Sequence, residues 1–173
     1  MKNIKNVQIY KENQELYNVI LPLWLAYFKE LQLAYVRELC ESEEEQQIVA
    51  EIQGLNRRIN IQGKRPDMHF EVFFQDDMPV GFANFAIDTG GIRGLIEASY
   101  GCVMEFYISP EFRRKGYGKS LYEHIEATLK NDGTQNIYLT SAIASIPFWI
   151  AMGFKESGKI DPDNDLPIYI KNI

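Results

Sequence analysis

The chain has 173 residues, of which 46% are hydrophobic and 24% are charged, and its formal net charge is -6. This length and composition fit one globular domain over residues 1–173 with a sizeable core, and they argue against a second domain. The acidic balance argues against a duplex nucleic-acid partner, which would require a broad basic face.

The longest apolar stretch, residues 19–28, contains Pro22 and is far shorter than the ~20 residues that span a membrane. The first residues carry no apolar run of the signal-peptide type. Cys40 and Cys102 are too few and too distant in sequence for a disulfide framework or a metal cluster of the His/Cys type. We therefore expect a soluble, cytoplasmic protein with no membrane segment and no metal site.

Apolar spacing predicts a short strand at residues 7–10 and then an amphipathic helix over residues 16–31. Pro22 lies inside that helical pattern, so the helix either starts near residue 21 or bends at the proline. A second helix is predicted after Ser42, because Ser42 and Glu45 have the spacing of a capping box.

The hydrophobic period then changes to that of strands. Residues 70–74 and 80–87 flank the turn-forming residues 76–79 and predict a hairpin. A glycine-rich loop over residues 88–94 leads to a strand at residues 102–109. These strands are expected to pair as neighbours in one sheet.

The C-terminal half predicts, in order, a helix, a strand, a short helix and a hairpin, at residues 121–129, 136–140, 145–152 and the pair 154–157 and 168–171. Gly153 fits the position just after a helix end, where a left-handed residue is favoured. The full predicted order is therefore β-α-α-β-β-β-α-β-α-β-β, an α/β (α+β) chain.

A basic stretch with two glycines joins the strand at residues 102–109 to the following helix: Arg113, Arg114, Lys115, Gly116, Tyr117, Gly118, Lys119 and Ser120. Gly116 and Gly118 allow the backbone to approach a ligand closely, and a helix start leaves N–H groups without acceptors. The spacing is neither a dinucleotide fingerprint nor a Walker loop. The stretch predicts a site for an anion such as a pyrophosphate.

The pattern R-x-x-G-x-G formed by Arg113, Gly116 and Gly118, between a strand and a helix, resembles the acetyl-coenzyme A signature of the GNAT acetyltransferase superfamily. Residues 145–154 are similar to a second family segment, in which Phe148 matches, as do the glycine and phenylalanine at its end. The resemblance covers nearly the whole chain. It implies the GNAT acyl-CoA N-acyltransferase fold, a mixed, mostly antiparallel central sheet flanked by helices.

The resemblance further implies acetyl transfer from acetyl-CoA to a primary amine of a small molecule or peptide, through a ternary complex. By family precedent, the strand before the loop supplies a backbone donor for the developing oxyanion and binds the pantetheine arm where it splays from residues 136–140. The implied CoA-binding residues are the basic stretch from Arg113 to Ser120, together with Phe106, Tyr107, Ile108, Phe148 and Trp149.

Glu105 is our candidate for the general base, because this carboxylate interrupts the apolar run of the strand on the substrate side. Apolar neighbours would raise its pKa and allow it to accept a proton directly or through water. The alternative is a glutamate that faces outward or forms a structural ion pair. Glu97, in the preceding loop, is a second choice.

The general acid is not evident, because Trp149 stands where the family often has a tyrosine, and an indole N–H is no proton source near neutral pH. Tyr107, Ser145, Tyr122, Tyr138 or a water molecule are the remaining candidates. This departure motivates an alternative function, a catalytically weak or inactive CoA-binding module that acts as a sensor or interaction domain.

The acceptor is expected to lie against the two N-terminal helices and the loop over residues 88–101, whose aromatic residues would either shape a pocket or serve as packing: Tyr17, Trp24, Tyr27, Tyr35 and Tyr100. One sequence does not rank the amines that would fit. The C-terminal hairpin offers an edge strand for a possible homodimer.

Overall fold

The computed structural model describes residues 4–10, 13–35, 39–62 and 64–173. Its helices and strands are β1 (Ile4–Gln8), α1 (Gln14–Tyr35), α2 (Glu41–Ile61), β2 (Met68–Gln75), β3 (Met78–Asp88), β4 (Tyr100–Ile108), α3 (Tyr117–Asn131), β5 (Asn136–Thr140), α4 (Ile146–Ala151), β6 (Lys155–Ile160) and β7 (Pro167–Asn172). Short 3-10 turns at Pro110–Phe112 and Ile143–Ser145 precede α3 and α4. The order of elements predicted from the sequence is confirmed.

The strands form one seven-stranded sheet in the order β1-β2-β3-β4-β5-β7-β6. All neighbouring strands are antiparallel except β4 and β5, which run parallel. The register between β4 and β5 holds only at Gly101↔Ile137 and Cys102↔Tyr138. Beyond Cys102 the two strands are no longer paired, so the sheet is open along the second half of β4.

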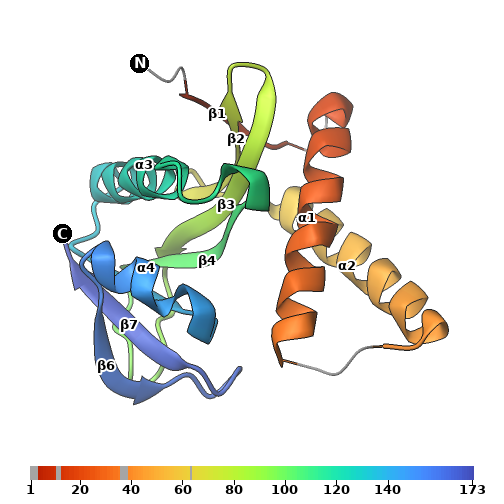
Figure 1. The fold of residues 1–173 in the computed structure, drawn as a ribbon. Helices are drawn as coiled ribbons and strands as arrows, with labels where there is room; N and C mark the ends of the chain where they lie inside the picture. Colours follow the sequence, from red (N-terminus) through yellow and green to blue (C-terminus); the bar gives the residue numbers. More distant parts are fainter. Residues whose placement is uncertain (1–3, 11–12, 36–38, 63) are drawn as a thin grey trace.

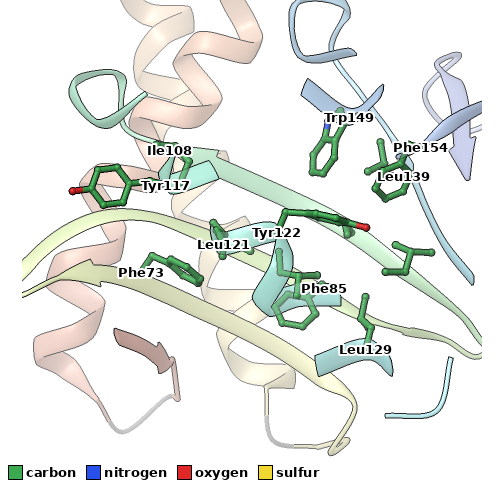
Figure 2. Close-up of a cluster of buried hydrophobic side chains, with 14 of the residues drawn as sticks. Phe73, Phe85, Ile108, Tyr117, Leu121, Tyr122, Leu129, Leu139, Trp149 and Phe154 are labelled. Carbon is green, nitrogen blue, oxygen red and sulfur yellow. The ribbon is translucent and has the colours of Figure 1, made fainter. Parts of the chain in front are cut away.

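Helices cover the sheet on both faces: α1 and α2 lie on one side, and α3 and α4 lie on the other (Figure 1). The face under α3 and α4 holds the larger core cluster, in which Leu121, Tyr122 and Leu129 of α3 pack onto Phe73 and Phe85 (Figure 2). A second cluster joins α1 and α2 to the opposite face. Both faces are therefore packed, which fixes β4 between two helical layers.

Helix α1 continues through Pro22, so of the two alternatives for this helix, a start near residue 21 is wrong. The side chain of Asn13 accepts a hydrogen bond from the Leu16 backbone N–H at 2.9 Å and caps the helix. Ile20 and Trp24 are fully buried on either side of the proline. We infer that this burial holds both halves of the helix against the sheet and offsets the hydrogen bond that Pro22 removes.

Helix α2 is capped two residues earlier than predicted. Its N-cap is Cys40, whose backbone N–H donates to Glu43 Oε2 at 2.9 Å. The reciprocal half of a capping box is thus made by Glu43 and not by Glu45. Because residues 43–45 are all glutamate, the capping-box spacing is met by more than one N-cap position for α2.

Two strands are shifted from their predicted ranges. The first strand occupies Ile4–Gln8, where Ile4 pairs with Gln75, and the Ile9 N–H donates separately to the Phe70 carbonyl at 2.8 Å. Strand β4 starts at Tyr100, since Tyr100 pairs with Asp88 at the end of a long β3.

Candidate active site

A β-bulge at Met104 shapes the centre of β4. Asn84 pairs with Glu105 and Phe85 pairs with Val103, so Met104 is the extra residue. An inserted residue reverses which side chains point to which face of a sheet. Val103 packs into the core under α3, whereas Glu105 points to the face covered by α1 and α2.

Glu105 is buried, with 8% of its surface exposed, and side chains from two helices contact it. Nη2 of Arg58 on α2 lies 2.6 Å from Glu105 Oε1, and the Tyr27 hydroxyl of α1 donates a second hydrogen bond. Burial raises the pKa of the Glu105 carboxyl above its ordinary value, and Arg58 and Tyr27 only partly oppose that rise. Glu105 is therefore both a buried acid of raised pKa and an ion-paired one, so the two alternatives predicted from the sequence hold together.

The basic stretch forms a tight loop at the start of α3. Gly116 is the N-cap residue, with a left-handed φ of 89°, and Arg114 also has a positive φ of 61°. The first helical hydrogen bond runs from the Ser120 N–H to the Gly116 carbonyl at 3.1 Å. A helix start has N–H groups with no intrahelical acceptor, and glycine at the cap has no side chain to satisfy them. Arg114 and Lys119 are exposed beside this end, which suits an anion.

Gly118 is the second residue of α3 and lies against Phe148 of α4. A Cβ at Gly118 would be 3.3 Å from Phe148 Cε2, which is tighter than an ordinary contact. The Phe148 ring in turn packs on Phe106 with 5.4 Å between ring centroids. The loop, α4 and β4 therefore meet at Gly118, and a larger residue there would fill the space between them.

Trp149, the other α4 residue expected to bind CoA, lies in the core. Its ring is 5% exposed and packs on Phe106, Tyr122 and Phe154 at centroid separations of 4.9, 5.9 and 5.5 Å (Figure 2). Trp149 thus packs behind Phe106 and Phe148, and its position gives it a packing role.

Arg113 connects the end of β4 to α1. Its Nε donates to the Ile108 carbonyl at 2.7 Å, and its Nη2 contacts both carboxylate oxygens of Glu30 at 2.9 and 2.7 Å. The Tyr107 hydroxyl donates to the same carboxylate at 3.1 Å. The guanidinium group of the signature arginine is thus engaged by α1.

The open side of β4 presents backbone groups. The Ser109 N–H donates to the Val80 carbonyl, and residues of an antiparallel pair bond to their partner strand alternately. Phe106 and Ile108 therefore direct their peptide groups away from β3, toward the gap where β5 diverges. The Ile108 carbonyl is used by Arg113. The N–H groups of Phe106 and Ile108 are the donors that a ligand in the gap would meet.

Tyr107 and Tyr138 do not suit the role of general acid. Burial, reinforced by the Glu30 carboxylate, raises the pKa of Tyr107 to about 12, and its hydroxyl is bound to α1. The Tyr138 hydroxyl donates to Asp88 at 2.7 Å, and burial raises its pKa further. Both groups hold their protons tightly at neutral pH.

Tyr122 and Ser145 are the other two candidates. Burial raises the pKa of Tyr122, whose ring lies within the core under α3. Ser145 is exposed in the turn before α4. The three tyrosines are therefore poor proton sources at neutral pH, which leaves Ser145 and water as the candidates proposed from the sequence.

The two histidines lie on the face opposite to Glu105. His124 of α3 has its Nε2 2.7 Å from Glu71 Oε2 on β2, and His69 of β2 has its Nε2 2.7 Å from Asp132 Oδ2 at the end of α3. The described residues contain no cluster of His, Cys, Asp or Glu suited to a metal ion. Within the same residues, no helix is both long and apolar enough to cross a membrane.

The expected acceptor wall is only partly a pocket. Trp24 is fully buried, and half-buried Tyr17 packs against the same core cluster, so both serve as packing, whereas half-buried Tyr27 reaches Glu105. Tyr100 packs in a separate cluster near the loop after β3. The side chain of Tyr35 lies outside the described residues. Glu97, the second choice for the base, is exposed in that loop.

Sequence reasoning missed Arg58 and Glu30, the charged partners of Glu105 and Arg113. The available signal was weak: Arg58 follows the buried Leu55 by three residues and adjoins the buried Ile59, so a cation stands beside an apolar helix face. Nothing in the sequence joins it to a carboxylate 47 positions away.

The open sheet and the glycine loop fit the acetyltransferase class expected from the signature, and comparison with known proteins gives the family. The sequence model of the acetyltransferase (GNAT) family matches residues 14–154. The chain belongs to this family. No match was found among the curated proteins.

Three solved structures illustrate the similarity of fold. PaiA N-acetyltransferase from Thermoplasma acidophilum, in complex with coenzyme A, has a TM-score of 0.72 at 20% identity, over 99% of both chains. PH1933 from Pyrococcus horikoshii OT3 has a TM-score of 0.71 at 18% identity over 99% of both chains. An acetyltransferase from Thermus thermophilus has a TM-score of 0.66 at 20% identity over 100% of both chains. At such identities the likeness concerns the fold.

Proposed function

We propose that this chain transfers the acetyl group of acetyl-CoA to a primary amine of a small molecule or peptide, in a ternary complex. The observation that carries the proposal is the position of Glu105. This buried carboxylate of raised pKa adjoins Phe106, whose peptide group faces the open side of β4, and the glycine loop follows at the end of the same strand.

The loop fits the pyrophosphate of coenzyme A. Gly116 takes a left-handed conformation at the helix start, and a side chain at Gly118 would crowd Phe148. Exposed Arg114 and Lys119 add positive charge around this helix end. When bound, acetyl-CoA supplies a thioester acetyl group and a thiolate leaving group. Family membership and the PaiA structure with coenzyme A support this co-substrate.

In the proposed reaction, the proton acceptor and the oxyanion donors both come from β4. Glu105 accepts a proton from the acceptor ammonium, directly or through water, which leaves a nucleophilic amine. The Phe106 and Ile108 N–H groups are placed to stabilise an oxyanion in the gap, as fixed backbone donors do when they lie ~3 Å from it. Because Trp149 is buried and Tyr107 is held by Glu30, a water molecule returns the proton to the leaving thiolate.

A second candidate function is a CoA-binding module with little or no turnover. It is favoured by the buried Trp149 in place of a tyrosine, and it is opposed by the buried Glu105, which such a module would not need. Cytoplasmic location and a homodimer through the C-terminal hairpin stay predictions. Strand β6 is the sheet edge there, and its Lys155 and Lys159 are residues that commonly oppose edge pairing.

The test is release of free thiol from acetyl-CoA by the purified protein across a panel of amines, with CoA binding measured by calorimetry. We expect turnover with one class of amine. Glu105→Gln should lower kcat/KM by about 10²–10⁴-fold, the usual contribution of a general base, with CoA affinity unchanged. Gly118→Trp should abolish both binding and turnover. Tight CoA binding without turnover on any amine would favour the binding module, and no CoA binding would refute the role of the glycine loop.

A further inference from the structure

The Glu105 carboxylate is held by side chains from both N-terminal helices. Arg58 comes from α2 and Tyr27 from α1, and each contacts the same buried group on β4. A base that lost one of these contacts would be free to rotate, and its ionisation would change. The helices therefore do more than enclose the acceptor side of the sheet.

Arg58 is itself held in place. Its guanidinium carbon lies 4.9 Å from the centre of the Trp24 ring, in a cation–π contact. Trp24 is fully buried, and its indole N–H donates to the Glu51 carbonyl on α2 at 3.0 Å. The arginine thus lies between a fixed aromatic ring and the carboxylate, with its side chain 32% exposed.

We propose that Arg58 is a positioning residue for acetyl transfer, which orients the Glu105 carboxylate through their 2.6 Å ion pair. The proposal rests on the proposed role of Glu105 as the base. Arg58 does not touch the acceptor in this scheme, and it acts only through Glu105.

The charges around Glu105 support this role. Burial is the largest influence and raises the pKa of Glu105; Arg58 is the largest opposing one, and Tyr27 adds to it. Glu51 on α2 raises the pKa further, and Asn84, opposite on β3, carries no charge. Cys102 on the same strand is a neutral thiol, because burial raises its pKa to about 12.

Removing Arg58 should raise the pKa of Glu105 and move the acid limb of the pH profile to higher pH. A general base must be deprotonated, so the acid limb of the kcat/KM profile follows the pKa of Glu105 in the free enzyme. Removing Arg58 leaves burial and Glu51 opposed only by Tyr27, which raises that pKa. An adjacent opposite charge changes a carboxyl pKa by about 1–3 units, and the acid limb should move to higher pH by a comparable amount.

The experiment compares Arg58→Gln with Arg57→Gln. Arg57 is the exposed neighbour on α2, so its variant removes the same charge without removing the ion pair. With one fixed amine, we expect a shifted acid limb for Arg58→Gln and a profile like that of the parent for Arg57→Gln. Arg58→Lys keeps the positive charge but lacks the planar guanidinium group that fits a carboxylate. It should therefore shift the acid limb less than Arg58→Gln does and still reduce kcat. Carbon-13 NMR titration of the Glu105 carboxyl in the ligand-free protein should show the same order of pKa values.

An unchanged Glu105 titration and acid limb in Arg58→Gln, with Glu105→Gln inactive, would overturn the role of Arg58 alone. Full activity of Glu105→Gln would instead refute the base itself and the positioning role with it. If Arg58→Gln does not fold, as judged by circular dichroism, Arg58→Lys decides: a titration and kcat equal to those of the parent would overturn the proposal.

Discussion

A single inserted residue, Met104, decides which face of the sheet Glu105 occupies. Without the bulge, Glu105 would share the face of Val103 and point into the apolar core under α3. With it, the carboxylate reaches Arg58 and Tyr27. An isolated buried charge is costly, so these partners are what allow a carboxylate at the centre of the sheet.

Gly118→Ala tests the contact between the loop and α4. The new Cβ would press on the Phe148 ring at 3.3 Å, so the ring or the helix start must move by a few tenths of an ångström. We expect CoA binding to weaken by about tenfold, or about 1.4 kcal/mol, in calorimetry. Adding Phe148→Leu should restore part of the loss. Gly54→Ala, where a Cβ makes only ordinary contacts, is the control, and equal weakening there would contradict the local explanation.

At the scale of elements, the connection from α2 to β2 shows how a short link is fixed. Arg65 Nε donates to Asp67 Oδ1 at 3.0 Å, and the same guanidinium donates to the Ile87 carbonyl at the end of β3. The Ile87 N–H donates to the Asp67 carbonyl at 3.2 Å. These contacts of Arg65 and Asp67 hold the entry to β2 against the end of β3.

Asp67→Asn should destabilise the protein at neutral pH by about 1 kcal/mol or less, because Arg65 is partly exposed and solvent screens the pair. The hydrogen bond from Arg65 holds the pKa of Asp67 below its ordinary value of 3.8. A lowered pKa contributes stability above the ordinary value and loses it as pH falls through the folded-state value. The difference from the parent should therefore shrink below about pH 4, as measured by urea denaturation.

Asp77→Asn, at an exposed carboxyl in the hairpin turn, is the control. A difference for Asp67→Asn that persists undiminished in acid would show that the amide distorts the link, and that the charge is not the cause.

At the scale of the whole molecule, the two sides of the site are linked through charged contacts. The Glu30–Arg113 pair joins α1 to the end of β4, and the glycine loop starts at Arg113. The net charge of -6 disfavours anions in general, yet Arg114 and Lys119 lie at the start of α3. The molecule thus concentrates positive charge where a pyrophosphate would bind.

CoA binding should stabilise the folded protein as a whole. At about a hundredfold excess over its Kd, a ligand that binds only the folded state adds about 2.7 kcal/mol. For a domain of this size, each kcal/mol raises Tm by about 2–4 °C, so we expect a rise of roughly 5–10 °C. Scanning calorimetry measures it. The Gly118→Trp variant should show no rise, and an equal rise in that variant would place the binding site elsewhere.

The sequence by itself determined the order of elements, the helical and strand periods and the glycine loop. These depend on local spacing: apolar residues repeat along one face, and glycine at positions 116 and 118 marks a turn and a close approach. The same local information placed Glu105 on a strand among apolar neighbours. It did not fix the cap positions, as residues 43–45 show, because several glutamates satisfy the same rule.

Only the tertiary structure decided which side chains meet. The pairing of Glu105 with Arg58, and of Arg113 with Glu30, joins residues 47 and 83 positions apart. The bulge at Met104 depends on register with β3, and the burial of Trp149 depends on the packing of α4 against α3. Long-range contacts, burial and the pKa values that follow from them arise from the folded chain as a whole, and no local pattern encodes them.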